Sequence, residues 1–207
     1  MKTHLASALV AAAVAASASL AQPVNLTFTR INGNAPQDVA SQFLAVVDDG
    51  PGDTVTFRFT NTAAIASSIT NIYFDDNNSL MNFGSFVTQT GTSFAQGGSP
   101  GNVPGGNSIN PAFNADIDLN VSAQGNPANG INTAADVLVV AFNLLNGANF
   151  ANLASALNNG DLRVAFHVRA IGTADDSDSF VSTVIPLPTT AALAGVGLLG
   201  LATRRRR

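Results

Sequence analysis

The chain contains no cysteine and no tryptophan, and only one tyrosine and two histidines. The absence of cysteine excludes disulfides, thiolate zinc sites and cysteine nucleophiles. Residues 22–184 also lack lysine and glutamate and contain a single histidine, His167. General acid–base and nucleophilic mechanisms usually need histidine, lysine or a tuned pair of carboxylates. The composition therefore predicts a protein that is not an enzyme and needs no organic cofactor.

Positive charge is scarce in the same region. Residues 22–184 carry thirteen aspartates and four arginines, which gives a formal net charge of −9. The whole chain has a net charge of only −4 because Lys2 and four C-terminal arginines lie outside this region. Phosphate contacts need clustered lysine and arginine, so we expect no nucleic-acid partner.

The first 21 residues have the three parts of a secretory signal peptide. Lys2 supplies the positive charge, residues 5–20 form an apolar run, and Ser19 and Ala21 are small residues at the −3 and −1 positions of a cleavage site. We expect signal peptidase to cleave before Gln22. The chain is therefore predicted to be exported.

The last 23 residues also have three parts. A proline motif, Ile185-Pro186-Leu187-Pro188, precedes the uncharged residues 189–203, and an arginine run follows: Arg204, Arg205, Arg206 and Arg207. As a helix, residues 189–203 would span about 22 Å, compared with about 30 Å for a hydrocarbon core. Arginine side chains can snorkel to the interface, and a basic cluster stays in the cytoplasm. We expect a short transmembrane helix with the body outside.

This tail resembles the PEP-CTERM sorting signal of bacterial surface proteins. Leu187 stands where the usual motif has glutamate, which resembles a variant form of that signal. The resemblance implies recognition and cleavage by an exosortase-type transpeptidase after transient anchoring in the inner membrane. It implies a final location in the cell envelope, at the cell surface or outside the cell, in a polysaccharide matrix or biofilm. A plain tail anchor is the alternative.

Residues 22–184 have the pattern of one β-rich domain. Apolar and polar residues alternate along several short segments that are separated by turn-rich sequences, which is typical of strands with one buried face. Residues 149–158 have helical spacing of apolar residues, with Gly160 at a C-cap position. We expect an antiparallel β-sandwich, jelly-roll or immunoglobulin-like, with one short helix. The expected strands are 24–29, 42–47, 54–59, 68–74, 80–88, 113–121, 136–144, 162–169 and 179–184.

Acidic turns are the best candidates for a metal site. Aspartate in flexible loops suits calcium, although no EF-hand order is present and plain solvated turns are the alternative. The candidate calcium ligands are Asp75, Asp76, Asp175, Asp176 and Asp178.

Two other residues, His167 and Tyr73, are candidate components of a functional site. His167 could join a Ser-His-Asp triad, but its place in the middle of a strand favours an exposed structural histidine. Tyr73 alternates with apolar neighbours and is predicted to be exposed, where one ring would make a weak glycan platform. The leading hypothesis is a structural or adhesive role outside the cell. The alternative is a glycan-binding module or an aspartate-based glycoside hydrolase.

Overall fold

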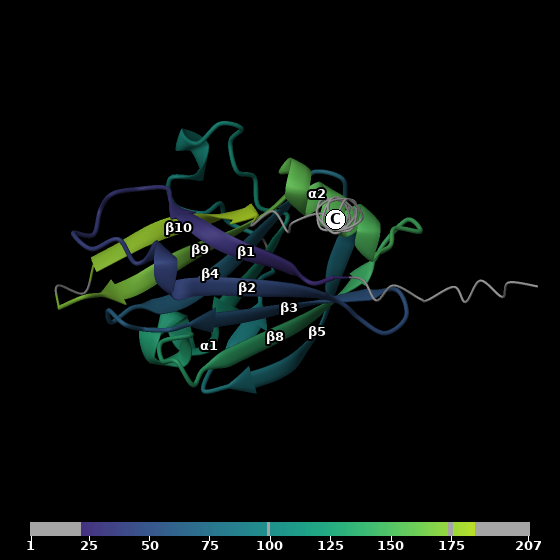
Figure 1. Ribbon diagram of the computed structural model, residues 1–207. Coiled ribbons are helices and arrows are strands. Elements are labelled where there is room, and N and C mark those ends of the chain that lie inside the picture. The colour runs from purple at the N-terminus through teal and green to yellow at the C-terminus, as the bar shows by residue number, and fades with distance from the viewer. Residues whose placement is uncertain (1–21, 99, 174–175, 185–207) are drawn as a thin grey trace, which may run out of the picture.

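A computed structural model describes residues 22–98, 100–173 and 176–184. Ten strands form one continuous, barrel-like sheet in the order β5-β8-β3-β2-β1-β10-β9-β4-β7-β6 (Figure 1). Every neighbouring pair is antiparallel. The strands are β1 (Val24–Arg30), β2 (Phe43–Asp49), β3 (Thr54–Asn61), β4 (Ser68–Asp76), β5 (Met81–Thr90), β6 (Phe94–Gln96), β7 (Ile117–Val121), β8 (Val137–Leu144), β9 (Leu162–Ile171) and β10 (Asp176–Val184).

The predicted antiparallel β-fold is confirmed, but the sheet is continuous and is not divided into two. Its two halves face each other across a core rich in phenylalanine. Ring centroids of Phe57 and Phe74 lie 5.3 Å apart, and those of Phe59 and Phe166 lie 5.8 Å apart. Strand β3 therefore packs on β4 and β9 through side chains, while the hydrogen-bonded path between them runs through β2, β1 and β10.

Alternation along the strands explains this core. In β3, Val55, Phe57 and Phe59 are fully buried, while Arg58 between them is exposed. The expected strand 113–121 begins only at Ile117, because Phe113 packs into a different cluster. The three-residue strand β6 was not predicted, since so short a segment shows little alternation.

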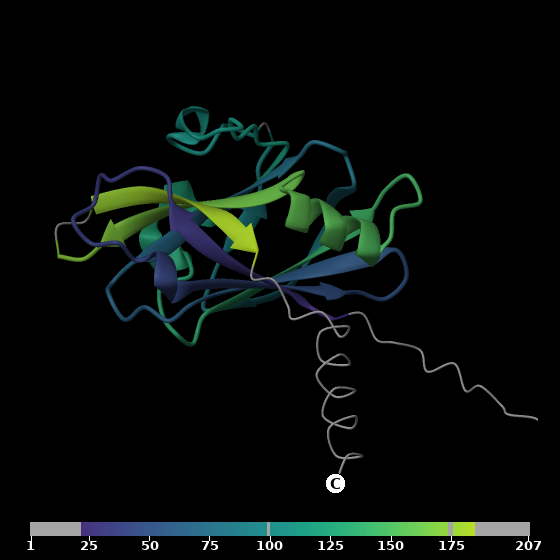
Figure 2. The same cartoon turned by 45° about the horizontal axis from the view of Figure 1, so that its top comes forward.

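Helix α2 (Phe150–Asn159) confirms the predicted helix and its cap. The Asn149 side chain accepts a hydrogen bond from the amide of Asn152, whose side chain bonds back to the Asn149 amide. Gly160 ends the helix with a φ of 79°, a left-handed conformation that glycine adopts readily. The buried face of α2 belongs to the main core, and the helix lies at one end of the body (Figure 2). The short helices are α1 (Ser122–Gly125), η1 (Ala40–Gln42), η2 (Gly106–Ser108) and η3 (Pro127–Asn129).

A long loop, residues 97–116 apart from residue 99, covers part of the outer surface of the sheet (Figure 2). We call it the outer loop. Its Val103 and Phe113 are buried and pack with Tyr73 and Ala165 in a second, smaller cluster. The outer loop therefore shields this part of the outer faces of β4 and β9 from solvent.

The two strands at the ends of the sheet, β5 and β6, meet through one side chain. The Gln89 Nε2 donates to the carbonyl of Phe94 at 3.3 Å, and the Phe94 amide donates to the Gln89 Oε1 at 2.5 Å. The side-chain amide thus takes the place of a strand partner. It links Gln89, next to last in β5, to Phe94, the first residue of β6.

Candidate functional site

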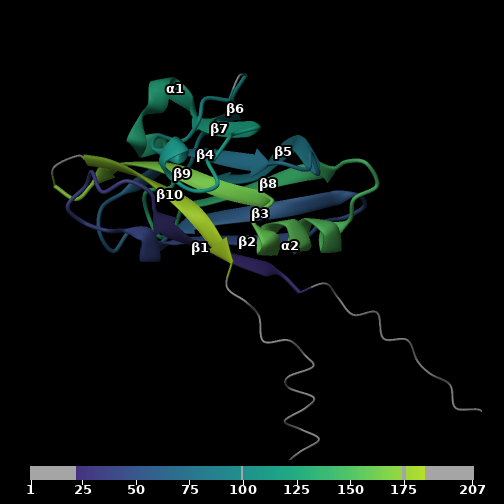
Figure 3. The same ribbon diagram turned by 90° about the horizontal axis from the view of Figure 1, so that it is seen from above.

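The first and last strands of the body pair with each other. Leu26 of β1 lies opposite Val184, the last residue of β10 (Figure 3). The exposed Gln22 lies two residues before β1. Ser19, Ala21 and the whole predicted tail lie outside the described residues. The body therefore begins and ends at one place, next to both predicted processing sites.

No helix in the part of the chain that the structure describes is long and apolar enough to cross a membrane. The predicted transmembrane helix, residues 189–203, lies outside that part.

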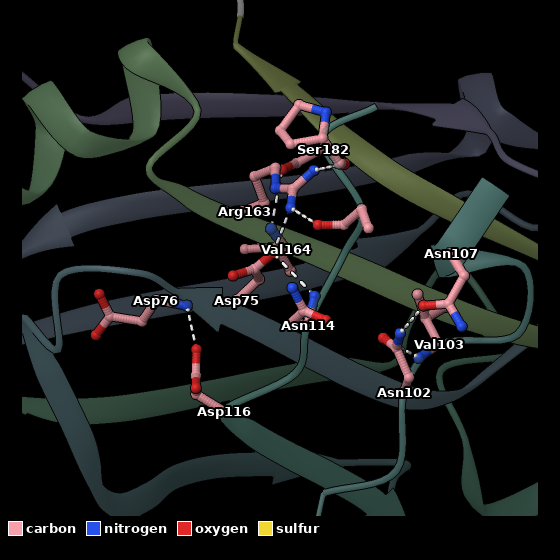
Figure 4. Close-up of polar contacts among 12 residues, drawn as sticks. Asp75, Asp76, Asn102, Val103, Asn107, Asn114, Asp116, Arg163, Val164 and Ser182 are labelled. Carbon is pink, nitrogen blue, oxygen red and sulfur yellow. Dashed lines mark hydrogen bonds and ion pairs between the residues drawn. The ribbon is translucent and has the colours of Figure 1, made fainter. Parts of the chain in front are cut away.

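Asp75 and Arg163 form an ion pair on the outer surface between β4 and β9 (Figure 4). The Arg163 guanidinium also donates to the carbonyls of Pro111 and Ala112 at 2.7 and 2.6 Å. Asp75 Oδ2 in turn accepts the amide of Asn114 at 3.1 Å. The ion pair therefore fastens the outer loop to the sheet through Oδ2 of Asp75, whereas its Oδ1 has no hydrogen-bond partner among the described residues.

Asp76 points to the other face of β4, because successive residues of a strand alternate. Its side chain accepts the amide of Met81 at 3.0 Å and is 4% exposed. Burial raises the pKa of Asp76 above its ordinary value of 3.8, and the nearby charge of Asp116 adds to the rise, against the lowering effect of backbone hydrogen bonds. Asp116 accepts the backbone amide of Asp76 at 2.8 Å. Asp76 thus closes the turn that leads into β5.

Two further candidate calcium ligands, Asp176 and Asp178, pair with residues toward the opposite end of β9. Asp176 pairs with Ile171 at the end of β9, whereas Asp76 pairs with Leu162 at its beginning. Nine residues of strand separate these positions by about 30 Å. Asp175 lies outside the described residues. The structure does not bring the two acidic turns together into one site.

Asp178 is also engaged in a structural contact. It forms an ion pair with Arg30 and accepts the backbone amide of Ala35 at 3.2 Å. Arg30 donates in addition to the carbonyl of Ala35. Asp178 therefore anchors the segment between β1 and η1 to β10.

Within residues 22–98, 100–173 and 176–184, no three histidine or aspartate side chains lie together in a group that could hold a metal ion. The hollows of the surface are open. One of about 360 Å³ lies between the β2–β3 turn and the start of α2, where Asp49 and Asp53 line it. Another of about 350 Å³ lies beside Arg163 and Ser182. Both are open to solvent.

His167 is half-buried rather than exposed as predicted. It lies in β9 opposite Asn71 of β4 and Ser179 of β10. Burial lowers the pKa of His167 below its ordinary value of 6.5; Arg169 lowers it further and Asp178 partly offsets the change. Its Nδ1 has no hydrogen-bond partner among the described residues. No hydrogen bond joins the His167 side chain to a serine or an aspartate in the described ranges, so the less favoured Ser-His-Asp interpretation gains no support.

Tyr73 is buried, which corrects the prediction of an exposed ring. It is 7% exposed and packs with Val103 and Phe113 of the outer loop. Burial raises the pKa of its hydroxyl to about 12, and the charge of Asp118 contributes. The ring is covered and offers no platform to a glycan.

Sequence reasoning missed the role of the arginines. Arg30 and Arg163 each donate to a loop carbonyl and pair with a buried aspartate, and Arg169 donates to the carbonyl of Gly125 at the end of α1. The rarity of arginine in the sequence could have indicated this role, because an arginine in an apolar strand needs a polar partner nearby in space. The charged side chains thus hold the loops in place.

Comparison with known proteins adds nothing to this description: no family model, no curated protein and no solved structure matches the chain.

Proposed function

We propose that this chain is an exported protein that an exosortase-type transpeptidase processes at its C-terminus. After processing, the body is displayed at the cell surface or in an extracellular polysaccharide matrix, where its role is structural or adhesive. Signal peptidase removes residues 1–21, and the inner membrane holds residues 189–203 until the tail is cut.

One observation carries this proposal. The last strand ends at Val184, and the proline motif begins at the next residue, Ile185. Proline cannot donate to a β-ladder, so we expect the motif to leave the sheet. A processing enzyme would meet an extended segment directly at the boundary of the folded body.

A non-catalytic role is supported by how the polar residues are used. Asp75, Asp76 and Asp178 bind backbone groups or arginines, and His167 bonds to neither a serine nor an aspartate among the described residues. We therefore favour a role carried by shape and surface over one carried by a reaction.

The arrangement of the sheet supports a more specific fold class. The two halves of the sheet pack face to face through the phenylalanine core, as the layers of a sandwich do. We infer that the body is a flattened relative of jelly-roll or immunoglobulin-like sandwiches.

The test is the intact mass of the exported protein recovered from its own host. Processing predicts a species that begins at Gln22 and lacks Arg204–Arg207. Replacing both Pro186 and Pro188 with alanine should leave the tail in place, whereas the control Pro104→Ala, in the outer loop, should be processed normally. Recovery of the unmodified protein with all four arginines would leave a tail anchor and reject the processing.

A further inference from the structure

The strand β5 is the long free edge of the sheet. It has ten residues, and its outward side has no partner strand among the described residues (Figure 1, lower edge). The other edge strand, β6, has only three residues. An unpaired edge presents backbone donors and acceptors to any second strand.

Natural proteins usually protect such an edge with lysine, other charges, proline or bulges. Strand β5 has bulges, but it has no charged residue and no proline, and neither does its neighbour β8. Its β-forming residues include Phe83, Phe86 and Val87. Val87 is 57% exposed, more than any other large apolar residue in the described part of the chain.

The exposure of Val87 results from the backbone. Two register shifts against β8, between Phe83 and Ser85 and between Phe86 and Thr88, leave Gly84 and Val87 as extra residues. Such bulges redirect side chains. The second bulge leaves Val87 exposed to solvent, whereas the half-buried rings of Phe83 and Phe86, whose centroids lie 5.0 Å apart, pack against the main core.

Charge restricts what can approach this edge. The body carries a formal charge of −9, yet residues 77–115 contain no charged side chain. Asp76 precedes β5 in the sequence, and Asp136 precedes Val137, the partner of Thr90 at the end of β5. Both carboxylates are buried and accept backbone amides. Two copies of this body repel each other over most of their surfaces, but the β5 edge is free of that repulsion.

We propose that β5 pairs with β5 of a second copy of this chain, antiparallel, around a two-fold axis. Each molecule has one long edge, so this pairing uses the edge of both partners and closes as a dimer. The short β6, tied to β5 through Gln89, offers no second edge for a filament. The two bulges restrict the register in which the strands can pair. This proposal does not depend on export or on processing of the tail.

The absence of cysteine provides a direct test. The test uses two single-cysteine variants of the full chain, Val87→Cys and Ser85→Cys, in mild detergent. Each variant is oxidised at low protein concentration and run on a non-reducing gel. A disulfide-linked dimer can only form through the introduced residue. The control is Ile65→Cys, at the other exposed large apolar side chain, in the β3–β4 loop. We expect rapid cross-linking at positions 85 and 87 and little at 65. Equal cross-linking at all three positions, or none at β5, would overturn the proposal.

Sedimentation of the full chain gives an independent measurement. Val87→Lys places a charge at the edge and should raise the dimer dissociation constant by at least about tenfold, whereas Ile65→Lys should change it by less than about twofold. A wild-type chain that stays monomeric at micromolar concentration rejects the dimer. Association that persists in Val87→Lys while position 87 fails to cross-link assigns it to another surface, and that result also rejects the proposal.

Discussion

Arg163 is the residue whose loss should matter most for the outer loop. It pairs with the buried Asp75 and donates to two loop carbonyls, and its Cζ lies 5.3 Å from the centroid of the Phe113 ring. Replacing it with methionine keeps the length of the side chain but leaves a buried carboxylate without its partner. We expect Arg163→Met to lower the free energy of unfolding by about 3–5 kcal/mol in urea titrations.

Arg58 provides the matched control, because it lies exposed on β3. Arg58→Met should change the free energy of unfolding by no more than about 0.5 kcal/mol. If the two variants unfold at the same urea concentration, the Arg163 contacts contribute nothing to stability and the structural account of Asp75 is wrong.

Tyr73 can be observed by itself, because the chain has one tyrosine and no tryptophan. Absorbance at the phenolate band during a pH titration should give a midpoint near the raised pKa of about 12. In urea the midpoint should fall to about 10, the value of a solvated tyrosine. The folded state holds this proton more tightly, so stability should decline as the pH rises above 10. A midpoint near 10 in the native protein would mean that the outer loop does not cover the ring.

At the scale of elements, the junction of β5 and β6 depends on Gln89. Its amide satisfies both backbone groups of Phe94, which is 4% exposed. Gln89→Leu leaves those groups without a partner and should lower the free energy of unfolding by about 1–3 kcal/mol. Amide hydrogen exchange should speed up at Phe94. Gln96→Leu, at an exposed position of β6, is the control and should leave both quantities nearly unchanged.

Most elements could be predicted because alternation is a local property of the sequence. Strand β9, with Val164 and Phe166 inside and Arg163 and His167 outside, follows directly from its pattern. Residues 113–116 were predicted wrongly because Phe113 is apolar and precedes a real strand. Its partner is Tyr73 in the second cluster, a long-range contact that no local pattern contains.

The candidate site was harder to predict than the fold. Aspartates in turns were recognised, but whether they share a site depends on register. Asp76 is the last residue of β4 and Asp176 is the first residue of β10. Both strands run antiparallel to β9, so the two aspartates lie at opposite ends of it. The arginine partners of Asp75 and Asp178 come from distant parts of the chain, so their ion pairs could not be read from spacing.

At the scale of the whole molecule, excess negative charge should make stability depend on salt. Residues 22–184 contain thirteen aspartates and four arginines, and two of these arginines form the ion pairs with Asp75 and Asp178. Salt screens repulsion between exposed charges more than it weakens buried pairs. We expect the melting temperature to rise by a few degrees between about 10 mM and 500 mM sodium chloride.

Two salts extend this measurement. Potassium chloride should produce the same rise, since screening depends on ionic strength. Calcium chloride at equal ionic strength tests the acidic turns, because an additional rise would indicate binding. A melting temperature that falls with sodium chloride would show that attraction, and not repulsion, dominates the charges of the body.

If the chain is exported as proposed, the pairing of β1 with β10 determines when it can finish folding. The first strand to emerge lies between β2 and the last strand to emerge, so the sheet stays open until residue 184 has passed. Loop closure between distant segments is slow, which delays the complete fold. We expect the chain to remain unfolded enough to be translocated until its last strand has crossed. The complete sheet then forms only after β10 arrives. Completion of the fold would then coincide with the moment at which the tail reaches the membrane.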